Sequence, residues 1–323
     1  MSGGPSVLFV AGAGRSGSTL LGTMCGQIDG FADVGELRHI WGRGLLANEL
    51  CGCGRPFRRC PFWTEVIEAA FGSFDAAAPA RRRELQRSVD RMWRIPQLRA
   101  ARGGSRFAAR AMTYAEAIRR LYAAVAATAG ARVVVDSSKS PSHVFVANLA
   151  RGLDVRVAHL VRDPRAVAFS WRRVRVRPEV AGGRESMPRI PAAWAAFEWD
   201  VMNAAARNTR TLGLPYALLR YEDLVARPGP ELARTLSELG LGSPELAFIR
   251  DDRVRLGPTH SVAGNPSRFV LGSVHLHPDL EWEDAMKRRD RLVVTALTWP
   301  LLGAYAYRPA VTARGSRTGR RGR

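Results

Sequence analysis

Short apolar runs alternate with helical patterns along most of this chain of 323 residues. The expected strands are Ser6–Val10, Arg132–Val135, Val155–Val161 and a run that ends at Leu219. A helical or turn-like stretch follows each of them, the clearest being "STLLGTMCGQI". Strands that alternate with helices predict a parallel sheet with right-handed crossovers. We therefore expect an α/β fold, with a three-layer arrangement of a parallel β-sheet flanked by helices.

The remaining segments extend this picture. Residues 31–63 are expected to form loops and short helices, and residues 64–130 to be helical with breaks near Pro96 and Gly103–Gly104. The apolar stretch Leu292–Tyr307 contains Pro300 and is short for a membrane span, so it is expected to be a buried helix and its exit. We expect one domain over residues 1–311 and a basic, disordered tail over 312–323.

The first strand leads into a glycine-rich turn that resembles a phosphate-binding loop. The pattern G-x-x-x-x-G-K-[ST] is satisfied at Gly12, Gly17 and Thr19, but Ser18 occupies the lysine position. Backbone amides at the start of a helix bind anions, and Arg15 can add charge. Without the lysine and a clear magnesium ligand, the loop is expected to cradle an inner phosphate in a P-loop-NTPase-like fold, without splitting a β–γ bond.

Two separated motifs carry a resemblance to a known family. "GRSGSTLL" resembles the 5′-phosphosulfate loop, and "HLVRDPRAVAFSWRR" the 3′-phosphate segment, of sulfotransferases that use 3′-phosphoadenosine 5′-phosphosulfate (PAPS). "LRYEDLVARP" and "HSVAGNPSRF" follow in the family's order, so the likeness covers about residues 6–270. The resemblance implies transfer of a sulfuryl group to a hydroxyl or phenol, with adenosine 3′,5′-bisphosphate as product and without a required metal.

The resemblance also assigns roles to single residues. Arg162 and Ser170 match the pair that binds the 3′-phosphate, and Tyr221 matches a tyrosine beside the adenine. The residues expected to bind the nucleotide are Arg15, Ser16, Gly17, Ser18, Thr19, Arg162, Ser170, Tyr221, Ser261, Asn265 and Arg268. The segment with the last three departs from the family's R-K-G-rich closing segment. A turn with a local salt bridge is the competing interpretation of Arg162–Arg165.

The resemblance to tyrosylprotein, carbohydrate and bacterial sulfotransferases points to Glu36 as the general base, since "FADVGELRHIW" follows the first helix. His39 and His260 are the other candidate bases. Arg15 and Lys139 are the expected catalytic cations, which stabilise charge as the sulfate bridge breaks. A helix-starting glutamate and a surface lysine are the alternatives for Glu36 and Lys139.

Charge and cysteine content refine these expectations. The formal net charge is +20, carried almost wholly by arginine, and this favours anionic ligands. Cys51, Cys53 and Cys60 cluster in "CGCGRPFRRCPFW". A zinc site would need a fourth ligand, which His39 or Cys25 can supply, but C-x-C with a third cysteine departs from the regular C-x-x-C pair. We expect reduced thiols that line a tight loop and no metal, with a local disulfide as a further option.

Two other functions remain open at this point. A metal-dependent nucleotide kinase or phosphotransferase would keep the anion cradle, and the Arg-rich composition permits nucleic-acid binding. The expected partner is a hydroxyl-bearing acceptor, a carbohydrate, glycoconjugate, tyrosine-like or small natural-product molecule. Neither a specific nucleic acid nor a membrane is expected as a partner. No secretory signal is evident, so the expected location is cytoplasmic.

Overall fold

The computed structural model describes residues 4–72, 76–101, 103–174, 176–180 and 185–307. The expected tail, 312–323, lies outside them. A five-stranded sheet, in which every paired strand is parallel, has the order β2-β3-β1-β4-β5. Its strands are β1 (Ser6–Ala11), β2 (Phe31–Gly35), β3 (Val133–Lys139), β4 (Asp154–Val161) and β5 (Tyr216–Arg220). The predicted α/β class with a parallel sheet is thereby confirmed.

β1 lies at the centre of the sheet because both of its faces are apolar. Side chains of one face, which include Val7 and Phe9, pack into a core with one group of helices, while Leu8 and Val10 pack into a second core on the opposite face. A strand buried on both sides is what a near-continuous apolar run predicts in a parallel sheet. Its neighbours β3 and β4 pair with it in parallel.

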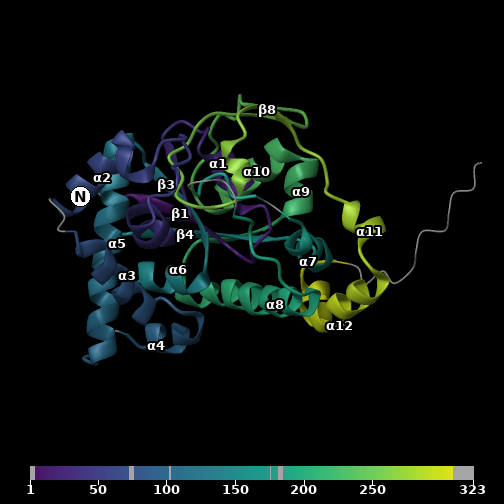
Figure 1. Cartoon of the computed structure of the whole chain (residues 1–323), viewed down its shortest axis with the longest axis horizontal. Helices are drawn as coiled ribbons and strands as arrows, with labels where there is room; N and C mark the ends of the chain where they lie inside the picture. Colours follow the sequence, from purple (N-terminus) through teal and green to yellow (C-terminus); the bar gives the residue numbers. More distant parts are fainter. Residues whose placement is uncertain (1–3, 73–75, 102, 175, 181–184, 308–323) are drawn as a thin grey trace, which may run out of the picture.

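Helices cover both faces of the sheet (Figure 1). The first face packs against α2 (Pro61–Phe71), α3 (Ala78–Val89), α4 (Ile95–Arg99), α5 (Arg106–Ala129) and α6 (Pro141–Ala147). The second face packs against α1 (Ser18–Cys25), α9 (Tyr221–Ala226) and α10 (Pro228–Glu238). This arrangement gives the three layers that the sequence predicts.

A further group of helices lies beyond β4 and β5. It consists of α7 (Pro164–Arg172), α8 (Ala192–Asn208), α11 (Glu281–Ala285) and α12 (Arg288–Ala304), and α8 and α12 lie side by side in Figure 1. A small antiparallel sheet is formed by β6 (Ile249–Arg250), β7 (Arg253–Leu256) and β8 (Gly272–His275). Residues of α7, of β8 and of the segment between β8 and α11 lie at the carboxyl end of the main sheet.

The structure confirms the four expected strands and the breaks in the helical region, since α4 begins near Pro96 and α5 begins after Gly103–Gly104. Residues 31–63 were expected to hold only loops and short helices, and this expectation is wrong at β2. β2 lacks a β-branched run, and it forms because it pairs with β3 at the edge of the sheet.

The expectation of a buried helix over Leu292–Tyr307 is also wrong in part. α12 continues through Pro300, and Leu292, Leu297 and Trp299 are exposed while Val294 and Leu302 are buried. The helix is therefore amphipathic and lies on the surface. Among the described residues, no helix combines the length and apolar character needed to cross a bilayer. The cytoplasmic location stays a prediction.

A buried polar network supports the carboxyl edge of the sheet from below. The Asp90 carboxylate accepts hydrogen bonds from Arg38 Nε (2.9 Å) and Ser142 Oγ (2.5 Å) and lies 2.8 Å from His143 Nδ1. Burial alone would raise the pKa of Asp90, but the Arg38 and His143 charges outweigh it and hold this pKa below 3.8. The backbone amide of Arg38 in turn donates to Ser138 Oγ, which links the exit of β2 to the exit of β3.

We predict that Asp90→Asn lowers the free energy of unfolding by about 3 kcal/mol, because the amide turns a donor toward Arg38 and leaves a buried cation without its counter-charge. The loss is present at neutral pH and shrinks as the pH falls through the folded-state pKa, where the wild-type carboxyl also becomes neutral. Urea unfolding measures it, with the exposed Asp29→Asn as control. Equal stability of the two variants would contradict this role.

Candidate active site

The carboxyl ends of all five parallel strands meet at one edge of the sheet. Each end carries or leads into a residue or loop that can bind a ligand or take part in a reaction. β1 leads into the loop 12–17, β2 into Glu36, β4 into Arg162 and β5 into Tyr221, and β3 ends at Lys139. In open parallel sheets ligands bind at this edge. The fold therefore brings the predicted residues together because of strand direction alone.

Two glycines of the loop are required by close approach and by backbone conformation. Gly12 has φ 145°, and a Cβ there would lie 2.3 Å from the carbonyl oxygen of Leu160 in β4. Gly17 has φ 94° and is the N-cap of α1, and a Cβ there would lie 2.4 Å from the Tyr221 ring. The absence of a side-chain cap at Gly17 leaves the first amides of α1 to other acceptors.

A cavity of about 530 Å³ opens at this edge. Its wall includes backbone and side chains from the anion loop, from the β3 and β4 exits and from the segment after residue 256. The predicted residues that line it are Arg15, Gly17, Ser18, Thr19, Glu36, Lys139, Arg162, Ser170, Tyr221 and Asn265. Ten of the thirteen expected site residues therefore share one cavity, and the other three are Ser16, Ser261 and Arg268.

Arg15 and Arg162 approach each other at the mouth of the loop. The Arg15 guanidinium lies over the Trp171 ring, 4.6 Å from its centroid, and Arg162 Nη1 donates to the Arg15 carbonyl oxygen at 3.1 Å. Arg15 has φ 66°, a conformation that side chains other than glycine rarely adopt. The two guanidinium groups are thus held at the end of β1 and β4 by an aromatic face and by backbone contacts.

Arg162 is oriented by three neighbours. Its Nη2 lies 3.0 Å from Asp279 Oδ2, its guanidinium lies 4.6 Å from the centroid of the Tyr221 ring, and its carbonyl oxygen accepts from Trp199 Nε1 at 2.9 Å. The local salt bridge that was the competing interpretation also exists, but it joins Asp163 to Arg165. The Arg162 side chain points to the cavity instead.

Glu36 is a buried carboxylate between two basic side chains. It is 8% exposed, forms an ion pair with Lys139 through Oε1, and places Oε2 3.4 Å from His39 Nε2. Burial would raise the pKa of Glu36, but the charge of Lys139 and the hydrogen bond from Lys139 outweigh it, so the pKa is lowered below 4.5. Glu36 is therefore ionised at neutral pH and able to accept a proton.

Glu36 and Lys139 differ from the alternatives that the sequence allowed. Glu36 is the N-cap of the short 3-10 helix η1 (Leu37–His39), yet its side chain makes no cap hydrogen bond. Lys139 has φ 65° and a side chain that is 18% exposed, so it is not a surface lysine. Burial lowers the pKa of His39 to about 4, which leaves its imidazole neutral beside Glu36 at pH 7.

Three of the expected nucleotide ligands are buried beside the cavity, outside its described lining. Ser16 is 1% exposed, and the Ser261 carbonyl accepts from Gly52 N. Arg268 is 1% exposed and donates from Nη2 to the Leu50 carbonyl at 2.9 Å. Their assignment as ligands stays a prediction. Asn265 does reach the cavity, and its backbone amide donates to Thr19 Oγ1 at 3.2 Å.

Sequence reasoning missed several residues of the cavity wall. Asp279 pairs with Arg162 and lies 3.5 Å from Arg173, which is itself part of the wall, and Arg43 enters from the segment after Glu36. The arginines stand out only as part of a general arginine excess, and nothing in the sequence around Asp279 links it to a residue more than a hundred positions away. The candidate base His260 lies in the cysteine cluster, outside the described lining of the cavity.

Comparison with solved structures finds similarity to several sulfotransferases. The solved sulfotransferase domain from the curacin biosynthetic pathway is 18% identical, covers 96% of this chain and 100% of its own, and has a TM-score of 0.52, which supports the shared fold. The sulfotransferase domain from the Synechococcus PCC 7002 olefin synthase is 20% identical (93% and 96% covered, TM-score 0.48). Sulfotransferase STF9 from Mycobacterium avium is 12% identical (74% and 64%, TM-score 0.40).

A search of curated proteins gives no match. The family comparison is decisive, because residues 5–245 match the model described as "Sulfotransferase family". That range contains the anion loop, Glu36, Lys139, Arg162 and Tyr221. The chain belongs to the sulfotransferase family.

Proposed function

We propose that this enzyme transfers the sulfuryl group of PAPS to a hydroxyl or phenol, with Glu36 as general base. The observation that carries the proposal is one cavity that holds an anion loop, a phosphate-binding pair and a base. The loop 12–17 precedes α1. Arg162 follows β4 and Ser170 lies in α7, while Glu36 lies beside Lys139. Family membership supports sulfuryl transfer, and the donor, the acceptor and the base are inferred from these contacts.

The cavity suits a nucleotide with two separated anionic groups. Its volume of about 530 Å³ lies within the range of small-molecule sites, about 300–1,000 Å³. One anion can meet the amides at the start of α1, where the helix dipole is positive, together with Arg15 and Lys139. A second can meet Arg162 and Ser170, and Tyr221 offers a ring to the base between them. Donor binding at these groups is the assignment we make.

The reaction follows from the roles of these side chains. Glu36 accepts the proton of the acceptor hydroxyl as its oxygen forms a bond to sulfur. The bond between sulfur and the bridging oxygen breaks, and its electron pair leaves with the 5′-phosphate of adenosine 3′,5′-bisphosphate. Arg15 and Lys139 stabilise the negative charge that develops on the bridge.

The acceptor is expected to enter from the side of Glu36. The cavity wall includes Arg43, from the segment that follows Glu36, and Met187, from the segment that follows α7. Residues 175 and 181–184 lie outside the described residues. A hydroxyl-bearing acceptor follows from the family.

The two competing functions receive less support. A metal-dependent phosphotransferase needs a carboxylate free to hold magnesium, but Asp136 is fully buried and accepts from Tyr122 (2.6 Å) and Ser138 (2.7 Å). Nucleic-acid binding would leave the enclosed carboxylate Glu36 and the anion loop without a role. We therefore expect transfer that needs no metal in the cavity.

Calorimetric titration of adenosine 3′,5′-bisphosphate tests the donor site. We expect tight binding that is independent of magnesium, with ATP binding weakly, and we expect Arg162→Ala to weaken bisphosphate binding at least tenfold by removing a buried charge-assisted contact. The same variant should affect adenosine 5′-phosphate less, because this ligand lacks the 3′-phosphate.

Equal losses for both nucleotides would contradict the role given to Arg162. Binding of ATP with magnesium and not of the bisphosphate would overturn the sulfotransfer proposal as a whole.

Replacing the base separates chemistry from binding. We predict that Glu36→Gln cuts the rate of sulfuryl transfer from PAPS to a phenol or sugar acceptor by ~10²-fold or more, because the amide accepts no proton at neutral pH. Bisphosphate affinity should change by less than about threefold, since the base contacts the acceptor side. In the wild type the lowered pKa of Glu36 places the acid limb of kcat/KM below pH 4.5.

An unchanged rate in Glu36→Gln, or an equal loss of binding and turnover, would remove Glu36 from the role of base.

Asp279 is expected to compete with the donor for Arg162. Its carboxylate pairs with Arg162 and is about a quarter exposed, so a bound phosphate must displace it. We predict that Asp279→Asn tightens bisphosphate binding about fivefold, equivalent to about 1 kcal/mol for one partly exposed ion pair. The exposed Asp284→Asn in α11 removes the same charge nearby and serves as the control. The bisphosphate affinities of both variants are measured by calorimetry at one ionic strength. Equal affinities of the two variants would mean that only the net charge, and not the pairing with Arg162, affects binding.

A further inference from the structure

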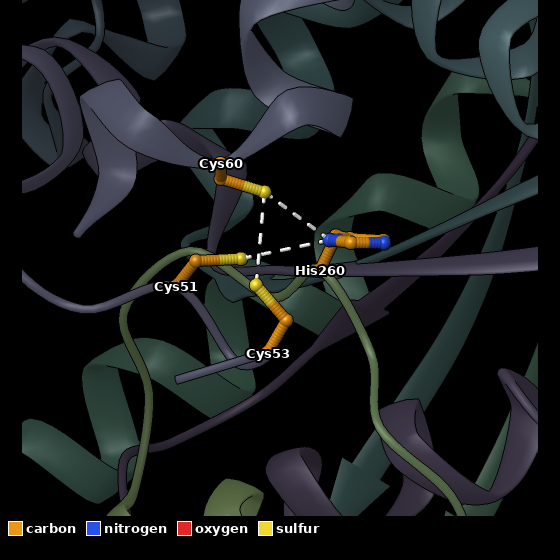
Figure 2. A group of neighbouring side chains, drawn as sticks. All are labelled: Cys51, Cys53, Cys60 and His260. Atoms are coloured by element: carbon orange, nitrogen blue, oxygen red, sulfur yellow. Dashed lines mark hydrogen bonds between the residues drawn. The ribbon is translucent and has the colours of Figure 1, made fainter. Parts of the chain in front are cut away.

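Three cysteine side chains of the loop 51–60 meet the side chain of His260, outside the described lining of the cavity. Figure 2 shows Cys51, Cys53 and Cys60 with their sulfurs turned toward one another and toward the His260 ring. Their ligand atoms all lie within 4.8 Å of one another. All four cysteines of the chain, Cys25 included, are free thiols in the structure.

Three of the six separations between the ligand atoms are close to the edges of a metal-centred tetrahedron. Sulfur ligands at about 2.3 Å and a nitrogen at about 2.0–2.1 Å from Zn²⁺ give edges of about 3.8 Å between sulfurs and about 3.6 Å between sulfur and nitrogen. The Sγ atoms of Cys53 and Cys60 are 3.7 Å apart, and His260 Nδ1 is 3.8 Å from Cys51 Sγ and 3.3 Å from Cys60 Sγ. A disulfide requires about 2.05 Å between sulfurs, so the cluster has the wrong spacing for one.

We propose that Cys51, Cys53, Cys60 and His260 form a structural zinc site. Three thiolates and one imidazole are a ligand set of closed, four-coordinate zinc centres. From the sequence alone, His39 and Cys25 are the candidate fourth ligands. The structure assigns His260 instead, since His39 contacts Glu36 and Cys25 is buried in the core at the end of α1.

The backbone between the cysteines is built for this convergence. The amide of Gly54, which has φ 81°, donates to the Cys51 carbonyl at 2.8 Å and closes a tight turn that turns Cys51 and Cys53 the same way. A Cβ at Gly52 would lie 2.3 Å from Ser261 Oγ, so only glycine lets this turn approach the segment that carries His260. Cys60 is the N-cap of α2, where the positive end of the helix favours a thiolate.

His260 is held in position by contacts that do not involve the sulfurs. Its ring stacks on Phe62, with centroids 4.4 Å apart and an interplanar angle of 10°, and its carbonyl oxygen accepts from Trp63 Nε1 at 2.8 Å. Its Nδ1 faces the sulfurs, and Figure 2 shows the other ring nitrogen pointing away from them. Cys51 and Cys60 are fully buried. A ring fixed in this way loses little freedom when it binds a metal.

The zinc would join two segments some two hundred residues apart. His260 precedes Val262 and Asn265, whose backbones pair with the exit of β2 and with Thr19. Gly52 N donates to Ser261 O at 3.0 Å, so the two segments already lie side by side. The four ligands are absent from the described lining of the cavity. The metal is therefore expected to stabilise the wall and to take no part in sulfuryl transfer.

Metal analysis of the full-length chain, produced without a histidine tag and passed over a desalting column, tests the site. We expect one zinc per chain by mass spectrometry of the metal content. Cys53→Ser, at the more exposed of the three sulfur positions, should lose the zinc, whereas Cys25→Ala should keep it and controls for loss of a buried cysteine. Substoichiometric zinc, or zinc that persists in Cys53→Ser, overturns the proposal.

Cobalt substitution keeps the test decisive if Cys53→Ser fails to fold. Co²⁺ exchanged into the wild-type chain should give intense visible bands of tetrahedral cobalt and thiolate-to-metal charge-transfer bands in the near ultraviolet, and zinc should displace both. A pale octahedral spectrum, or mass spectra of the unfolded chain with a disulfide between two of these cysteines, would overturn it. These readouts do not depend on sulfotransfer, so failure of either proposal leaves the other open to its own test.

Discussion

The ion pair between Glu36 and Lys139 is the contact on which the geometry of the carboxyl edge depends. It joins the exits of two adjacent strands, and the pairings of β3 with β1 and with β2 both shift register just before it. These irregularities and the positive φ of Lys139 turn the lysine side chain toward the glutamate. Two buried charges of opposite sign stabilise the edge only as a pair, because either one alone would be desolvated without compensation.

The segment from Gly257 to Phe269 connects that pair to the rest of the site. Val262 exchanges backbone hydrogen bonds with Val34 and Glu36, at 2.8 and 2.7 Å, and so continues the sheet beyond β2. A few residues later Asn265 reaches Thr19 in the anion loop. The backbone of Glu36, the Thr19 hydroxyl and the cysteine cluster are thus coupled through one irregular stretch. Any displacement of this stretch changes the distance between Glu36 and the start of α1.

The parts of this arrangement that the sequence predicts are those encoded by local pattern. β-branched runs such as that of β3 and the glycines of the loop 12–17 predict their own conformation, and strand direction then places Arg162 and Tyr221 at one edge. β2 contains Asp33 and Gly35, and it becomes a strand only by pairing with β3, so no local signal predicts it.

The remaining contacts depend on pairs distant in sequence. The fourth member of the cysteine cluster lies two hundred positions after Cys60, and a lone histidine carries no signal of that neighbour. The same holds for Asp279, whose partner Arg162 is 117 residues away. Both become visible only when the chain is folded, because tertiary packing and not local propensity brings them together.

The net charge suggests that the arginines are available to anionic ligands, but in the fold several of them are paired with carboxylates. Arg43 and Arg177 share Glu49 and Glu179 in a partly buried network, at 2.6 to 3.1 Å, so the charges of these two arginines are already neutralised locally. At the cavity Arg162 is likewise paired with Asp279. An anionic ligand therefore exchanges one ion pair for another. The gain is the difference between the partly exposed Asp279 carboxylate and a phosphate that presents more acceptor oxygens to the same guanidinium. This exchange limits the affinity for a ligand with a single anionic group. It favours ligands with two anionic groups, one at the loop amides and one at Arg162, because the second contact offsets the cost of opening the Arg162–Asp279 pair.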